Sequence, residues 1–192
     1  MHPEFEKYLK ENTSLTQDDI HHINNKAFDK TLHRNELLLQ AGDICKHKVF
    51  VVKGLLRMYS IDSNGNEHIL QFAPEHSWTL DVESYDKQIP SEINMGAIEP
   101  TEVMLWQKDD FNKLLSEVPE LSKLSQQIIS RNIYYSRQRM LTTLSATPEE
   151  KYDDFIERFP KLLTRLPLRM IASYLGISIK TLTRIRHNQL HR

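Results

Sequence analysis

The chain has 192 residues, of which 39 % are hydrophobic and 27 % are charged, and its formal net charge is −1. This length allows one large domain or two small ones with packed cores. No apolar run approaches the roughly 20 residues of a membrane-spanning helix, and the acidic N-terminus does not have the pattern of a signal peptide. We therefore expect a cytoplasmic protein without membrane contact. The single cysteine, Cys45, excludes an internal disulfide and an iron–sulfur cluster held by several thiolates.

Two short helices are predicted near the N-terminus. Phe5, Tyr8 and Leu9 have the spacing of one helix face. Thr16, followed three residues later by Asp19, resembles a capping box that opens a second helix.

Between residues 28 and 107 the pattern changes to short β-favouring runs. Turn residues separate these runs, and Asn64-Gly65 between two of them is a strong hairpin signal. Many short strands separated by turns are typical of a sandwich or barrel, and we expect a jelly roll. The predicted runs are Leu37–Leu39, Val49–Tyr59, Glu67–Phe72, Asn94–Ile98 and Val103–Trp106.

A long helix is predicted next, from Pro119 to residue 144, without an interior Gly or Pro. It carries two apolar stripes, roughly 80–100° apart around the helix axis. One stripe can pack on the chain's own barrel and the other on a symmetry mate; the alternative is burial on both sides within one subunit. The second stripe consists of Ile129, Ile133, Met140 and Leu144. We expect the dimer interface at the first stripe, which consists of Leu121, Leu124, Ile128 and Tyr135.

Charge is distributed unevenly along the chain. Residues 161–192 contain seven basic residues and no acidic one, which leaves 18 basic and 26 acidic residues for residues 1–160. A terminus of +7 on a body of −8 suggests a polyanionic partner, and DNA is the commonest one. A solvated basic face or a membrane-surface element is the alternative. The basic residues are Lys161, Arg165, Arg169, Lys180, Arg184, Arg186 and Arg192.

The same segment has the pattern of a helix-turn-helix. Pro167 suits the first turn of one helix, and Gly176 supplies the positive φ that ends it. Ser178 has the right type and place to N-cap a second helix. That helix has an inward stripe of Ile179, Leu182 and Ile185 and an outward set of Lys180, Thr181, Thr183, Arg184, His187 and Asn188. The pattern predicts a basic helix for the major groove; the alternative is a basic hairpin that caps a core.

A jelly roll, a long helix and a helix-turn-helix, in this order, resemble the Crp/Fnr family of bacterial transcription regulators. Phe50–Tyr59 is similar to the family's strand–glycine–strand signature, and Asn64–Phe72 to the hairpin that follows it. Ser145–Pro160 is similar to the helix that leads into the DNA-binding module. Ile171–Arg186 is similar to the family's helix-turn-helix and is closest to that of the short Bacteroidetes-type members.

The resemblance covers nearly the whole chain and implies an α+β fold. We expect a cyclic-nucleotide-binding-like barrel at residues 1–118, a dimerisation helix at residues 119–144 and a helix-turn-helix domain at residues 145–192. Since Arg192 follows directly after the second helix, we expect the family's usual β-hairpin wing to be absent. The implied partners are a near-palindromic double-stranded DNA operator, a second copy of the chain, RNA polymerase and an unknown small-molecule effector.

By position, the resemblance implies roles for individual residues. Ile179, Lys180 and Arg184 take the places of the principal base-facing residues, and Arg184 is the best candidate for a bidentate contact to guanine. Lys180 replaces a glutamate that is frequent there, so cytosine readout is expected to be lost. The phosphate contacts are expected at Arg169, Ser178 and Thr181. His187 and Asn188 complete the expected DNA-binding set.

The expected ligand site departs from the family pattern. Cyclic-nucleotide binders hold the phosphate with a Gly-Glu pair and an Arg-Ser pair. Glu75–Asp81 has no Gly-Glu, and Ser91-Glu92 stands where Arg-Ser would, with Glu92 of the wrong sign for a phosphate. No glycine lies between residues 65 and 96 to let backbone amides approach an anion. We therefore expect no cyclic-AMP binding; the alternative is a regulator that responds to a cyclic nucleotide or another small ligand.

A cupin-like metalloenzyme is the alternative from another class, because cupins are also jelly rolls. A cupin centre needs closely alternating histidines and a carboxylate. His68, His76 and Glu75 are the nearby candidates, and the chain has no His-x-His. A lone cysteine beside a turn such as Gly42-Asp43, as Cys45 is, is more often an incidental residue at a strand edge than a redox sensor or haem ligand. We expect no catalytic residue, metal or cofactor, and therefore no enzyme.

Overall fold

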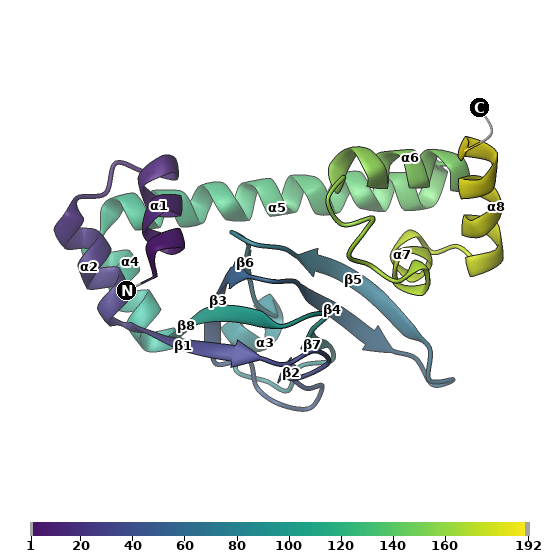
Figure 1. The fold of residues 1–192 in the computed structure, drawn as a ribbon. Coiled ribbons are helices and arrows are strands. Elements are labelled where there is room, and N and C mark those ends of the chain that lie inside the picture. Colours follow the sequence, from purple (N-terminus) through teal and green to yellow (C-terminus); the bar gives the residue numbers. More distant parts are fainter. Residues whose placement is uncertain (1, 191–192) are drawn as a thin grey trace. The chain divides into compact units, whose positions relative to one another are not determined.

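A computed structural model describes residues 2–190 of the chain (Figure 1). Within these residues the helices are α1 (Pro3–Asn12), α2 (Gln17–Asn25), α3 (Val82–Lys87), α4 (Lys108–Glu117), α5 (Pro119–Ser145), α6 (Pro148–Arg158), α7 (Leu168–Leu175) and α8 (Ile179–Leu190). The strands are β1 (Ala27–Leu32), β2 (Leu37–Leu39), β3 (His47–Lys53), β4 (Leu56–Ile61), β5 (Glu67–Ala73), β6 (Trp78–Thr79), β7 (Asn94–Ala97) and β8 (Thr101–Gln107). Arg192 of the basic segment lies outside the described residues.

The chain forms two compact units. Unit 1 comprises residues 1–60 and 71–130, and unit 2 comprises residues 61–70 and 131–192. The division falls inside α5, and the tip of the β4–β5 hairpin belongs to unit 2. The boundaries of these units differ from those of the expected domains 1–118, 119–144 and 145–192. The units are defined by contacts between residues far apart in the sequence, and these contacts divide the long helix between the two units.

The strands form two four-stranded antiparallel sheets, as expected for the α+β barrel fold. Their orders are β1-β8-β3-β6 and β2-β7-β4-β5. The predicted run Val49–Tyr59 is divided into β3 and β4 at Gly54, which has a φ of 93°. A Cβ there would lie 2.5 Å from the Thr101 hydroxyl and 2.6 Å from the Pro100 carbonyl oxygen, so only glycine fits. Strands β1 and β6 have no predicted counterpart.

Side chains from both sheets fill the barrel of unit 1. Large members of this interior core include Leu32, Val51, Leu56, Met95, Val103 and Leu105. A second core covers the outer face of the first sheet and is rich in aromatic rings. Its largest members are Phe5, Phe50, Trp78, Trp106 and Phe111. The two tryptophans are therefore core residues, and the Trp106 indole N–H donates to the Ile23 carbonyl at 2.9 Å.

Helices α1, α2, α4 and the first part of α5 supply the helical side of this second core (Figure 1). Helix α2 begins with the predicted capping box: the Thr16 hydroxyl accepts from the Asp19 amide, and the Asp19 carboxylate accepts from the Thr16 amide. The expectation for the first α5 stripe needs correction. Leu121, Leu124 and Ile128 are buried in the core of their own subunit, so they do not form a face for a second copy.

Unit 2 consists of the hairpin tip, the second part of α5 and helices α6 to α8. Thr147 and Glu150 form a capping box that starts α6. The buried side chains of this unit belong mainly to α6, α7, α8 and the segment between α6 and α7. They are Tyr152, Phe155, Leu162, Leu166, Met170, Ile171, Ala172, Leu175, Leu182 and Ile185. The three helices therefore have a core of their own.

Candidate nucleic-acid interface

The segment from Pro167 to α8 is a helix-turn-helix, as its local residues predict. Pro167 caps α7 with extended backbone, and Gly176 ends it in the left-handed region with a φ of 65°. The next amide, that of Ile177, donates to the Ala172 carbonyl at 3.0 Å, which closes the helix end. The Ser178 hydroxyl accepts from the Thr181 amide at 3.0 Å and so caps α8.

Helix α8 has one buried face and one exposed face. Leu182 and Ile185 are buried, as expected for the inward stripe, but the Ile179 side chain is 52 % exposed. Ile179 at the first position therefore belongs to the outer surface. Of the expected DNA-binding residues, Thr181 is half-buried. The others are exposed: Arg169, Ser178, Ile179, Lys180, Arg184, His187 and Asn188.

Acidic side chains of α6 reach the exposed face of α8. The Arg184 guanidinium donates to the Glu149 carboxylate at 2.9 Å. The Gln189 amide donates to the Asp153 carboxylate at 2.7 Å. These partners lie 35 and 36 positions apart in the sequence, so no local pattern predicts them. Both arginine and glutamate are largely exposed, and such pairs contribute little to stability and exchange readily.

The second part of α5 exposes apolar side chains within unit 2. Leu144 is 80 % exposed and Met140 63 % exposed, values that are unusual for such side chains in water. Tyr135, the fourth residue expected at the dimer interface, is also exposed. The remaining exposed members in this part of the helix are Ile133, Tyr134 and Leu141. Tyr135 lies on the opposite side of the helix from Ile133, and the rest of this set, from Ile133 to Leu144, is the exposed α5 stripe.

Two residues expected near a cyclic phosphate, Ser91 and Asp81, are hydrogen-bonded to each other. The Ser91 hydroxyl, where an arginine would be expected, is buried and donates to the Asp81 carboxylate at 2.7 Å. Asp81 also caps α3 by accepting from the Ser84 amide. Glu92 is exposed. The two residues that the resemblance puts near a phosphate therefore have each other as partners, and neither carries a positive charge.

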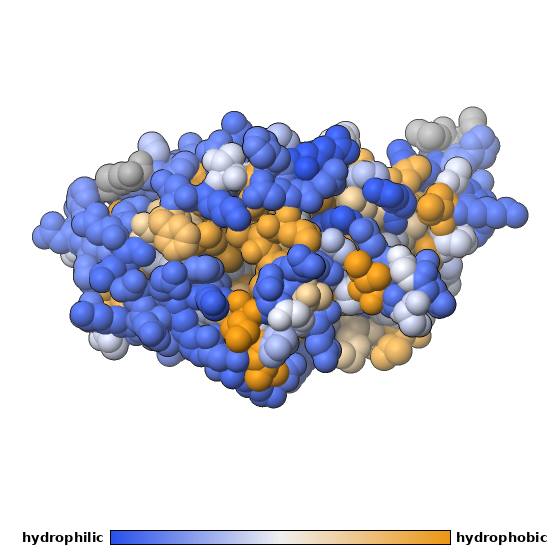
Figure 2. Space-filling view, turned by 90° about the horizontal axis from the view of Figure 1, so that it is seen from below, coloured by the Kyte–Doolittle hydropathy of each residue, from blue (hydrophilic) through white to orange (hydrophobic). Residues whose placement is uncertain are grey.

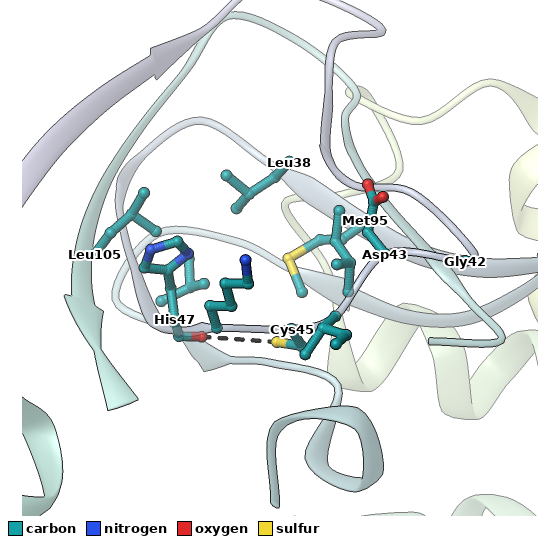
Figure 3. Close-up of a pocket in the computed structure, with 11 residues that line it drawn as sticks. Leu38, Gly42, Asp43, Cys45, His47, Met95 and Leu105 are labelled. Carbon is teal, nitrogen blue, oxygen red and sulfur yellow. Dashed lines mark hydrogen bonds between the residues drawn. The ribbon is translucent and has the colours of Figure 1, made fainter. Parts of the chain in front are cut away.

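A separate pocket of about 430 Å³ opens in the barrel (Figure 3). Its lining is part polar and part apolar. The Cys45 thiol donates to the backbone carbonyl oxygen of His47 at 3.8 Å. Burial raises the pKa of the Cys45 thiol and lowers the pKa of the His47 imidazole. Both side chains are therefore held in their neutral forms at pH 7. The apolar part of the lining comes from Leu38, Leu39, Ile44, Val49, Met95 and Leu105.

The candidates for a cupin-like metal site each have other partners. His68 pairs with Asp62 at 3.1 Å, and His76 lies 3.9 Å from Glu4. The Glu75 carboxylate accepts from the Gly54 amide at 3.0 Å. Over the residues that the structure describes, no group of three or more His, Cys, Asp or Glu side chains is arranged to hold a metal ion.

The surface that faces the viewer in Figure 2 is mostly hydrophilic, with apolar residues gathered in its middle part. None of the helices within residues 2–190 combines the length and the hydropathy of a membrane-spanning segment.

Comparisons with known proteins agree with this architecture. Residues 29–118 match the family model of the cyclic nucleotide-binding domain. The chain is 26 % identical over 171 residues to the transcriptional activator protein FnrA of Stutzerimonas stutzeri. This alignment covers 81 % of this chain and 68 % of FnrA. The chain is 24 % identical over 188 residues to the transcriptional activator protein Anr of Pseudomonas aeruginosa, covering 90 % and 75 %. The chain belongs to the Crp/Fnr family of transcription regulators.

Solved structures show the same fold at low sequence identity. FixK2 from Bradyrhizobium japonicum aligns with a TM-score of 0.75 and 19 % identity, over 86 % of this chain and 84 % of that one. The catabolite activator protein of Thermus thermophilus aligns with a TM-score of 0.58 and 16 % identity, over 93 % and 85 %. The match to the cyclic nucleotide-binding domain ends at residue 118 and therefore does not include the helix-turn-helix.

Proposed function

We propose that this Crp/Fnr regulator is a homodimer that binds a near-palindromic DNA operator through α8 and acts in the cytoplasm. The observation that carries the proposal is the helix-turn-helix, in which a basic helix presents Ile179, Lys180 and Arg184 on an exposed face. A helix of this kind fits the major groove, where base edges differ in their donors and acceptors.

Base readout and phosphate contacts are assigned to different residues. Arg184 can donate two parallel hydrogen bonds to guanine once it leaves Glu149, and the exposed Ile179 can contact a thymine methyl group. Arg169 and the α8 N-terminus, with Ser178 and Thr181, are suited to phosphate oxygens, because helix N-termini attract anions.

The exposed α5 stripe is the proposed dimer interface. Apolar side chains spaced along a helix become buried when two such helices pair around a two-fold axis. This assignment replaces Leu121, Leu124 and Ile128, which are buried in unit 1. Tyr135 is left out of it, because Tyr135 lies on the other side of α5, where its ring is 5.5 Å from the Arg158 guanidinium.

The barrel is proposed not to bind cyclic AMP, because Ser91 and Asp81, which are expected near the phosphate, are hydrogen-bonded to each other. A small ligand of another kind is the second candidate as effector, since the pocket of about 430 Å³ lies in the range of small-molecule sites.

Sequencing of DNA fragments selected from a random library by the purified wild-type protein tests the proposal. We expect a palindromic motif whose half-sites lie about one helical turn, roughly 34 Å, apart. Recovery of no enriched motif at low salt would contradict sequence-specific binding.

A further inference from the structure

The tip of the β4–β5 hairpin is held by side chains of α5 and α7. Strand β5 lies at the edge of its sheet, where backbone groups lack a neighbouring strand. The Ser173 hydroxyl of α7 supplies partners to two of these groups. It donates to the Glu67 carbonyl oxygen at 2.6 Å and accepts from the Ile69 amide at 3.0 Å.

Arg139 of α5 completes the attachment. Its guanidinium donates to the carbonyl oxygens of Ile69, at 3.0 Å, and Leu70. It also donates to the Tyr174 carbonyl oxygen at 2.9 Å and lies 4.0 Å from the centre of the Tyr174 ring. One planar side chain with several fixed donors thus joins α5, the hairpin and α7, a geometry that the single ammonium group of lysine cannot reproduce.

These contacts do not cover the face proposed to read DNA. Ser173 and Tyr174 belong to α7, whereas Ile179, Lys180 and Arg184 of α8 are exposed. The three helices α6 to α8 also have a buried core of their own. The contacts of Arg139 and Ser173 therefore bear on how these three helices, which we call the DNA-binding module, are oriented on α5.

Orientation on α5 matters because α5 carries the exposed stripe. In a dimer, the second part of α5 would define the two-fold axis, and each α8 would sit at a fixed distance and angle from it. The covalent link is short: α5 ends at Ser145 and α6 begins at Pro148. Arg158 of α6 adds one weaker contact, 5.5 Å from the centre of the Tyr135 ring. Arg139 and Ser173 provide the second attachment point, on α7.

We propose that Arg139 and Ser173 are positioning residues that set the half-site spacing accepted by the dimer. The proposal rests on the proposed function, since it requires two recognition helices on one operator. One inserted base pair moves a half-site by about 3.4 Å and rotates it by roughly 35°, so a rigidly held module tolerates little change of spacing. A loosely held module can follow the displaced half-site but loses preorganisation.

The test measures binding by fluorescence anisotropy to the selected operator and to duplexes with one or two base pairs inserted or removed at its centre. For the wild type we expect each one-pair change to weaken binding about tenfold or more. For Arg139→Gln and Ser173→Ala we expect about fivefold weaker binding at the best spacing and a penalty of only about two- to threefold per pair. Arg139→Lys should give an intermediate result, and the slope of affinity against salt should not change, because neither residue is proposed to bind a phosphate.

Arg131→Gln is the matched control, since it removes the same charge from an exposed position of α5 and should keep the wild-type spacing profile. A wild-type protein without any sequence preference would refute the proposed function itself. If the wild type is specific but the variants keep its steep spacing profile, the positioning role is wrong. An equal loss of affinity at every spacing, with a lowered melting temperature, would likewise reduce Arg139 and Ser173 to structural residues and overturn the inference.

Discussion

The Arg184 guanidinium donates a 2.9 Å hydrogen bond to the Glu149 carboxylate, so the side chain best suited to read a base is held by an acidic residue of α6. The pair is exposed, with 58 % of the arginine side chain and 48 % of the glutamate side chain accessible. Exposed pairs of this kind contribute at most about 1 kcal/mol. Arg184 can therefore exchange Glu149 for guanine at small cost.

Glu149→Gln is expected to strengthen operator binding about three- to tenfold at low salt, because it replaces the charged acceptor of Arg184 with a weaker neutral one and removes a negative charge near a polyanion. Fluorescence anisotropy over a salt series measures the effect. Glu157→Gln is the control, because it makes the same charge change at another exposed position of α6. Equal gains for both variants would mean that long-range charge alone is responsible and that the ion pair has no role.

Arg184→Ala and Arg169→Ala are expected to differ in kind. Arg184→Ala should cost about 1–3 kcal/mol and relax the preference at one base position per half-site. Arg169→Ala should weaken binding to all sequences alike and reduce the log–log salt slope by about 0.9 for each phosphate that is no longer neutralised. Binding titrations combined with selection from a random library separate the two effects. If Arg184→Ala left the selected motif unchanged, α8 would bind only the DNA backbone.

Ile133→Asp is expected to produce monomers, because it places a charge in the exposed α5 stripe. Light scattering should then give a mass near 22.6 kDa, and the chain should remain folded. Ile128→Asp should instead lower the free energy of unfolding by more than about 3 kcal/mol, because Ile128 is buried in unit 1. A wild-type chain that is monomeric at micromolar concentration would contradict the proposed dimer.

Cyclic AMP and cyclic GMP are expected to bind no better than about millimolar, since Ser91 stands where an arginine would be expected and its hydroxyl is bound to the Asp81 carboxylate. Isothermal titration calorimetry measures this directly. Micromolar affinity for either nucleotide would show that the pair between Ser91 and Asp81 opens and that other residues supply the missing charge.

Lys48→Met is expected to stabilise unit 1. The Lys48 ammonium lies 5.9 Å and 5.7 Å from the ring centres of Trp78 and Phe111, and burial lowers the pKa of Lys48 to about 8. The unfolded chain, with its higher lysine pKa, binds more protons between about pH 8 and 10.5, so the wild-type free energy of unfolding should rise with pH across this window.

The substitution should raise the free energy of unfolding by about 1–3 kcal/mol at pH 7 and remove this rise at alkaline pH. Urea unfolding at pH 7 and pH 10 measures both effects. Lys46→Met, at an exposed neighbouring position, is the control. A destabilised Lys48→Met variant would mean that the contacts of the ammonium with the two rings outweigh the cost of its burial.

Local features of this protein follow from the sequence by itself. The capping box at Thr16 and Asp19, the helix end at Gly176 and the cap at Ser178 were all predictable. Each depends on backbone geometry and hydrogen bonds within about four residues, which neighbouring residue types determine. The order of barrel, long helix and helix-turn-helix follows from the same local signals in succession.

Tertiary structure alone decided which stripe of α5 is buried, because both stripes have the same apolar pattern and only the position of the barrel distinguishes them. It likewise brought Glu149 to Arg184 and joined Arg139 and Ser173 to the hairpin tip. These partners lie 35 to 106 positions apart. The path of the chain through space, and no local preference, determines whether such groups meet.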